Sequence, residues 1–161
     1  SMNKKIILIG VIVFILCLGA VSAAKLDSKK FGDDFSIKVP KGSHFVAQKQ
    51  NMSGTDGFFN KNMSLDSYVD NQNQIMILYS SVPIFSEDSV DMLYQMMFQN
   101  LNPDLDSCYE TQDGDLKFLK PIKKSSTNMA LAGFNQGNKT VMVIGTDYDL
   151  VYDMGKTIKF S

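Results

Sequence analysis

The chain has 161 residues, of which 44% are hydrophobic and 20% charged, and its formal net charge at pH 7 is -1. Every basic side chain other than the one histidine is a lysine, because the sequence contains no arginine. The near-neutral charge argues against a broad basic surface for nucleic acid. The absence of arginine argues against a strong bidentate clamp for phosphate or carboxylate groups.

The N-terminal segment is typical of an export signal. Lys4-Lys5 is followed by an unbroken apolar run, Ile6–Val21, and then by the small residues Ser22–Ala24. A signal peptidase would cut after Ala23 or one residue later. The two lysines would stay on the cytoplasmic side in either case. The sequence therefore predicts an extracytoplasmic protein, secreted or anchored to the outer face of the cell membrane.

Cleavage and anchoring are alternative fates of this leader. The apolar run is longer than the usual hydrophobic centre of a signal peptide, about 7–15 residues. It is shorter than the about 20 residues that a spanning helix needs. The alanine-rich end favours cleavage, and an uncleaved N-terminal hydrophobic helix that anchors the chain is the alternative. Cys17 is not expected to be a lipidation site, because large apolar residues surround it.

The remainder of the chain has the length of one domain with its own core. We divide the sequence into a leader (1–24), a short polar linker (25–30) and a single domain (31–161). With Cys17 in the leader, Cys108 is left alone and no internal disulfide can form. We interpret Cys108 as a small buried hydrophobic side chain, and a reactive or intermolecular thiol is the alternative.

The first part of the domain is predicted to form strands. Phe35, Ile37 and Val39 alternate with polar residues, the pattern of a half-buried strand, and Pro40–Gly42 has the chemistry of a turn. The run Ile75–Tyr79 is continuously apolar, which favours a central strand covered on both faces. Further strands are predicted at 45–48, 65–69 and 74–81, with a short extended piece at 58–59 and a hairpin at 71–73.

The second part mixes helices with hairpins. Helical spacing of apolar residues predicts a helix from Ser86 to Leu101. Asp113-Gly114 is a two-residue hairpin signal, and Thr146 with Asp149 resembles a capping box that opens a short helix. A second hairpin is predicted between 129–134 and 140–144, and a last extended piece at 157–160. Hairpins imply antiparallel pairing, and helices must cover the sheet. The expected class is therefore α+β, an antiparallel sheet covered by helices and preceded by the N-terminal hydrophobic helix.

In this order the elements resemble the PsbP-like sandwich. Phe35–Gly42 is similar to the opening strand and Pro-x-Gly turn of that family, and Phe45 stands where the family often has Trp. Ile75–Pro83 with the following helix resembles the central strand and first long helix. The pieces 129–144 and 149–160 resemble the late hairpin, final helix and terminal strand. The fold is shared by extrinsic photosystem proteins, by Ran-binding Mog proteins and by exported bacterial and archaeal domains of unknown role. The chain is also similar to small exported proteins of methanogens. The resemblance implies an α/β/α sandwich that binds partners and has no catalytic motif.

Few residues suggest a catalytic or metal-binding role. His44 is the only histidine, so a zinc site built on several His or Cys ligands is not expected. A nucleophilic pair of Cys108 with His44 is the enzymatic alternative. Asp104–Asp106 and Asp113–Asp115 invite a calcium interpretation, but they lack the full loop pattern. We therefore predict no catalytic residue, cofactor or metal.

Two sets of residues are candidates for modification or contact. Export makes glycosylation acceptors relevant, and the sequence has three, at Asn51, Asn62 and Asn138. Met92 and Met96 lie off the apolar stripe of the predicted helix and are candidates for a soft hydrophobic surface. The favoured interpretation is a helix packed beneath loops, and a surface for a partner is the alternative.

The function predicted from these observations is a non-catalytic binding or accessory domain at the cell surface. Its partner would be a protein or an envelope component, with membrane contact through the N-terminal segment if that segment is retained. The two alternatives are a thiol enzyme or redox protein that depends on Cys108, and a structural component of envelope assembly.

Overall fold

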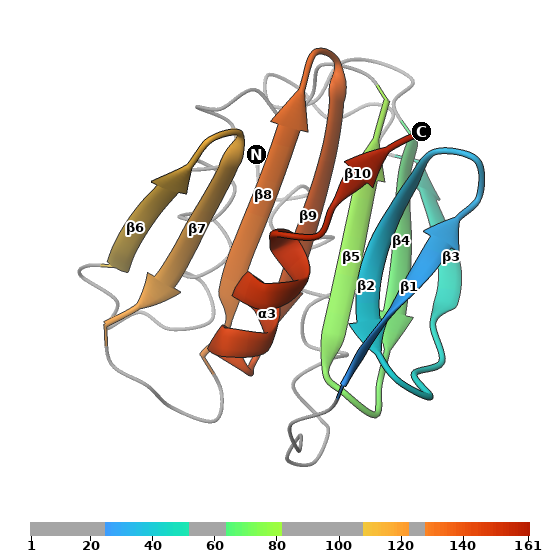
Figure 1. The fold of residues 1–161 in the computed structure, drawn as a ribbon. Helices are drawn as coiled ribbons and strands as arrows, with labels where there is room; N and C mark the ends of the chain where they lie inside the picture. The colour runs from blue at the N-terminus through green and yellow to red at the C-terminus, as the bar shows by residue number, and fades with distance from the viewer. Residues whose placement is uncertain (1–24, 52–63, 82–107, 123–127) are drawn as a thin grey trace.

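A computed structural model describes residues 25–51, 64–81, 108–122 and 128–161, and these form two antiparallel sheets with one short helix (Figure 1). The smaller sheet has the strand order β1-β2-β10. Its strands are β1 (Leu26–Phe31), β2 (Phe35–Pro40) and β10 (Lys159–Phe160). The smaller sheet and the helix lie side by side over one face of the larger sheet.

The larger sheet has seven strands in the order β3-β4-β5-β9-β8-β7-β6. The strands are β3 (Val46–Asn51), β4 (Ser64–Asp70), β5 (Ile75–Ser80), β6 (Cys108–Asp113), β7 (Leu116–Pro121), β8 (Ala130–Gln136) and β9 (Lys139–Gly145). β5 pairs with β9 although 58 residues separate their ends in sequence. This long-range pairing joins the two halves of the chain into one sheet.

Glycine turns set the hairpins at the β6–β9 end of the sheet. Gly114 and Gly137 each open a two-residue turn with φ of +59°. Glycine adopts this conformation without steric cost, and glycine at the first central position is typical of hairpin turns. Both predicted hairpins are confirmed. The first turn is made by Gly114 and Asp115, one residue later than predicted, because Asp113 pairs with Leu116.

A different chemistry builds the β4–β5 turn. The buried carboxylate of Asp70 accepts hydrogen bonds from the backbone N–H groups of Gln72 and Asn73 and from the side-chain amide of Asn73, at 3.0, 3.4 and 2.6 Å. Gln74 then takes a φ of 54°, which is uncommon outside glycine. The hairpin predicted around Asn71–Asn73 is confirmed, and Asp70 is the residue that holds it.

The core lies between the two layers. Inward-facing side chains from β2, β5, β8 and β9 are almost fully buried, and Phe35, Ile77, Val143 and Val151 are 0% exposed. The opposite face of β5 is buried as well, with Met76 at 1% and Leu78 at 2%. The prediction that this strand is central and covered on both faces is confirmed.

Helix α3 (Tyr148–Gly155) packs on β8 and β9 and links the larger sheet to β10. Its N-cap is Asp147, whose carboxylate accepts a hydrogen bond from the backbone N–H of Leu150 at 3.1 Å. The predicted cap at Thr146 is therefore wrong by one residue. The hydroxyl of Thr146 instead donates to the side-chain carbonyl of Gln74, which ties the start of the helix to the β4–β5 turn. The inward positions Leu150, Val151 and Met154 are buried as predicted.

Two sequence-based predictions need correction. The described chain is mostly strand in two antiparallel sheets, so an α+β fold whose sheet is covered by helices is wrong; a second sheet does much of the covering. The linker predicted at 25–30 is also wrong, because Leu26–Lys30 belong to β1 and pair with β2. An edge strand is held by its backbone and can carry polar side chains, so it lacks an apolar pattern. The leader and the helix predicted at 86–101 lie outside the described residues.

Candidate functional site

An aromatic cluster joins the two layers at the β1–β2 turn. The rings of Phe31 and Phe35 stack with centroids 5.2 Å apart, and Phe31 also meets Phe45 at 5.4 Å. Tyr68 of β4 lies 4.6 Å from Phe31, and Tyr79 of β5 lies 5.2 Å from Phe35. Aromatic pairs at these separations are favourable beyond the area they bury. The cluster therefore fixes the small sheet against β4 and β5.

Two carboxylates border this cluster. Asp34 lies in the β1–β2 turn, close enough to Tyr79 for its charge to act on the phenol, and Asp66 pairs across the strands with Tyr79. Burial raises the pKa of Tyr79, and the negative charges of Asp34 and Asp66 raise it further. The pKa of Tyr68 is raised by burial first, and then by Asp66 and Asp34. Both phenols therefore stay protonated at physiological pH and act as neutral hydrogen-bond donors or packing groups, without the character of catalytic bases.

Sequence reasoning missed this cluster. Asp34 and Tyr79 are 45 positions apart in the chain, and neither belongs to a short motif. The one available signal was Tyr79 at the end of a wholly apolar strand, because a buried tyrosine hydroxyl usually needs a hydrogen-bond partner. The local pattern did not indicate that a carboxylate of the β1–β2 turn lies near this phenol.

The predicted nucleophilic pair is not assembled. His44 is exposed between β2 and β3, whereas Cys108 is the first residue of β6. Strands β3 and β6 form opposite edges of the larger sheet, with five strands between them. At a strand spacing of about 4.8 Å the two edges are roughly 29 Å apart. A His44–Cys108 catalytic pair is therefore excluded by the topology.

The acidic residues of the β6–β7 turn serve the hairpin. Asp115 accepts a hydrogen bond from the side-chain amide of Gln136 at 2.9 Å, and Gln112 donates to the carbonyl of Gly114 at 2.8 Å. Both contacts stabilise turns at one end of the sheet. Within the described ranges, no three His, Cys, Asp or Glu side chains gather as a metal site would require. Asp104–Asp106 lie outside those ranges.

Of the glycosylation candidates, Asn138 is the one whose side chain is described. It lies exposed in the β8–β9 turn. Thr140 of the same tripeptide is 1% exposed, and its hydroxyl donates to the side-chain carbonyl of Asn135 at 2.6 Å. Asn51 ends β3, and Asn62, Met92 and Met96 lie outside the described residues. The Asn138 side chain is therefore accessible, whereas Thr140, the third residue of its acceptor tripeptide, is buried.

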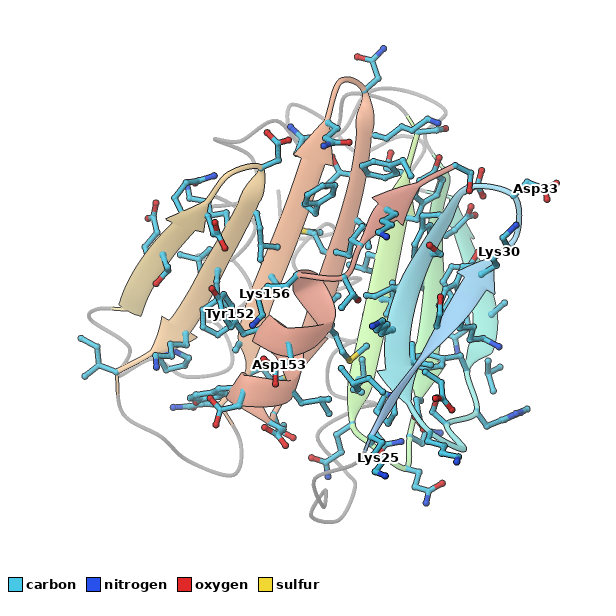
Figure 2. The ribbon with its side chains drawn as sticks, viewed as in Figure 1. Lys25, Lys30, Asp33, Tyr152, Asp153 and Lys156 are labelled. Atoms are coloured by element: carbon cyan, nitrogen blue, oxygen red, sulfur yellow. The ribbon has the colours of Figure 1, made fainter. Side chains whose placement is uncertain are left out.

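Exposed charge differs between the two parts of the outer layer (Figure 2). Lys25 and Lys30 lie near opposite ends of β1, and Asp33 projects from the turn beyond Lys30. On α3, Lys156 lies 4.7 Å from the Tyr152 ring centroid and 3.4 Å from the Asp153 carboxylate. The small sheet thus presents lysines, whereas the helix pairs its lysine with an acid. Among the described helices, none is long and apolar enough to cross a membrane.

Comparison with solved structures shows a distant similarity. The fold is similar to the solution structure of cyanobacterial PsbP (CyanoP) from Synechocystis sp. PCC 6803, with a TM-score of 0.46 and 10% identity. The similarity covers 89% of this chain and 96% of that chain. The similarity concerns the fold alone. No family model matches the chain, and no curated protein matches it.

Proposed function

We propose that this protein is an exported or membrane-tethered, non-catalytic binding or accessory domain on the outer face of the cell membrane. Its partner is a protein or an envelope component. The observation that carries the proposal is the position of the first strand directly behind the leader. The carbonyl of Lys25 accepts a hydrogen bond from the backbone N–H of Lys41 at 2.7 Å, so ordered pairing begins at the first described residue.

This position limits where the domain can be if the leader is retained. Four residues, 22–25, separate the apolar run from β1. An extended segment of four residues spans at most about 14 Å. A retained leader would therefore hold the domain directly at the membrane surface, and a cleaved leader would release it complete.

The experiment uses the full chain with a C-terminal tag in a host that exports proteins. We expect protease added to intact spheroplasts to digest the tag, and N-terminal mass spectrometry to show whether residues 1–24 are kept. Replacing Lys4 and Lys5 by Glu should impair outward placement, whereas replacing Lys117 by Gln should not. A tag that stays protected until the membrane is lysed would overturn the extracytoplasmic assignment.

The non-catalytic assignment is tested separately. Turnover of any substrate that is lost on changing Cys108→Ser or His44→Gln would overturn the non-catalytic assignment. We expect both variants to behave as the parent chain. Thiol titration of the folded protein separates the redox alternative, which requires a reactive Cys108.

A further inference from the structure

The β1–β2 hairpin concentrates positive charge in an otherwise acidic domain. Residues 25–41 hold five lysines and three acids, whereas residues 42–161 hold nine lysines and fourteen acids. The five lysines, Lys25, Lys29, Lys30, Lys38 and Lys41, are all exposed. We call this set the hairpin lysines.

The strand register places Lys30 and Lys38 on the outer face of the hairpin, whereas Lys29 pairs with the inward-facing Ile37 and its Nζ lies 5.6 Å from the Phe31 ring centroid. Phe35, Ile37 and Val39 of β2 point inward and are buried, so Lys38 points outward. Lys30 pairs with Ser36, the other outward position of β2, and therefore shares the outer face. Lys25 and Lys41 lie opposite each other at the open end of the hairpin, where the backbone N–H of Lys41 donates a hydrogen bond to the carbonyl of Lys25 at 2.7 Å.

The hairpin lysines form no ion pair with an acid among the described residues, and the ion pairs present there lie elsewhere. The acids of the hairpin itself are Asp27 on β1 and, at the closed end, Asp33 and Asp34. Asp34 is only partly exposed, and its charge acts on the Tyr79 phenol. The open end, next to the leader, is therefore the most positive part of the hairpin.

We propose that the hairpin lysines dock this domain on an anionic lipid surface. This inference rests on the tethered form of the proposed function. The tether of about 14 Å keeps Lys25 within reach of the headgroup region. A lysine near an anionic surface strengthens binding about fivefold, and the attraction extends roughly one Debye length, about 8–10 Å. The acidic remainder is repelled by the same surface, so the charge separation orients the domain with β1 and β2 toward the membrane.

The test measures the depth of two positions in the full chain. Cys17 and Cys108 are replaced by Ser, and one fluorophore is attached through Ser28→Cys on β1 or through Asn138→Cys in the β8–β9 turn. In Figure 1 this turn lies at the end of the molecule opposite to the start of β1. The chain is inserted in vesicles of phosphatidylcholine, or of equal parts of phosphatidylcholine and phosphatidylglycerol. Both contain a lipid with a nitroxide headgroup that quenches nearby fluorophores.

In the anionic vesicles we expect strong quenching at position 28, weak quenching at position 138, and loss of the difference in high salt. The variant K38E/K41E should lower the ratio of docked to undocked domain roughly 25-fold or more, because each lysine strengthens docking about fivefold and two lysines are lost. The control K120E/K156E makes the same charge change outside the hairpin and should leave the ratio unchanged. Circular dichroism and the thermal midpoint verify that both variants are folded.

Equal quenching at the two positions, or equal effects of the two double variants, would overturn the inference and leave an acidic protein surface as the occupant to consider. Flotation of the vesicles in high salt reports the tether independently. A chain that floats without selective quenching refutes docking and leaves the proposed function intact. A chain that does not float refutes the tether, and docking with it.

Discussion

The ring of Tyr79 in β5 stacks on the ring of Phe35 in β2, with centroids 5.2 Å apart and an interplanar angle of 25°, so one aromatic contact joins the two sheets. Tyr79 is 4% exposed and Phe35 is 0% exposed. The contact is therefore buried between the layers. It also explains why the small sheet has a fixed position on the larger one.

Removing this ring should weaken the joint between the sheets. We expect Tyr79→Ala to lower the free energy of unfolding by about 3–5 kcal/mol, because a buried aromatic side chain that stacks on Phe35 is lost. Urea denaturation measures the change. Tyr152→Ala is the matched control and should cost less, because Tyr152 is only half-buried on α3 and contacts Lys156 through its ring. Equal stability of the two variants would contradict the assigned role of Tyr79.

The two tyrosines of the cluster should make the protein sensitive to alkali. Their pKa values are raised in the folded state, so the unfolded chain releases these protons at lower pH. Stability is therefore complete below the unfolded value of about 10 and declines as pH rises through the folded values. Absorbance of tyrosinate against pH should show a late-titrating component from Tyr68 and Tyr79, and Tyr79→Phe should reduce it. A late component that Tyr79→Phe leaves unchanged would refute this prediction.

Close packing of α3 on β8 should make Gly155 intolerant of a side chain. A Cβ at this position would lie 2.7 Å from the Cβ of Ala132 and 3.2 Å from Cδ1 of Leu116. We expect Gly155→Ala to destabilise the fold by about 1–3 kcal/mol, the usual effect of overpacking. In an Ala132→Gly background the loss should shrink, which a double-mutant cycle measures as a coupling energy. Additive effects would indicate that the helix can shift away.

The burial of Thr140 predicts when Asn138 can be modified. An acceptor tripeptide needs its Thr as well as its Asn, and the Thr140 hydroxyl is occupied inside the fold. In a host that glycosylates we expect a glycan at Asn138 only if it is added before folding. Mass spectrometry should find the chain modified when the transferase acts during synthesis, unmodified when the folded protein is treated, and unmodified after Asn138→Gln. Efficient modification of the folded protein would contradict the prediction.

Local signals in the sequence were sufficient for several strands and turns. The apolar run in β5, the alternation in β2 and the glycines at 114 and 137 predicted these elements, because burial on both faces, burial on one face and positive φ each leave a mark within a few residues. The cap of α3 was misplaced by one residue, since Thr146 and Asp147 both suit an N-cap and only tertiary contact with Gln74 separates their roles.

By itself, the sequence determined that Cys108 is the one cysteine outside residues 1–24 and that antiparallel hairpins follow one another. These properties depend on composition and on neighbours within a few residues. Tertiary structure alone decided that Leu26–Lys30 form a strand, that a second sheet covers the first, that His44 and Cys108 lie at opposite edges, and that Lys30 and Lys38 share the outer face of the small sheet. Each of these depends on pairing between distant segments, whose backbone hydrogen bonds are made by any sequence and therefore leave no local pattern.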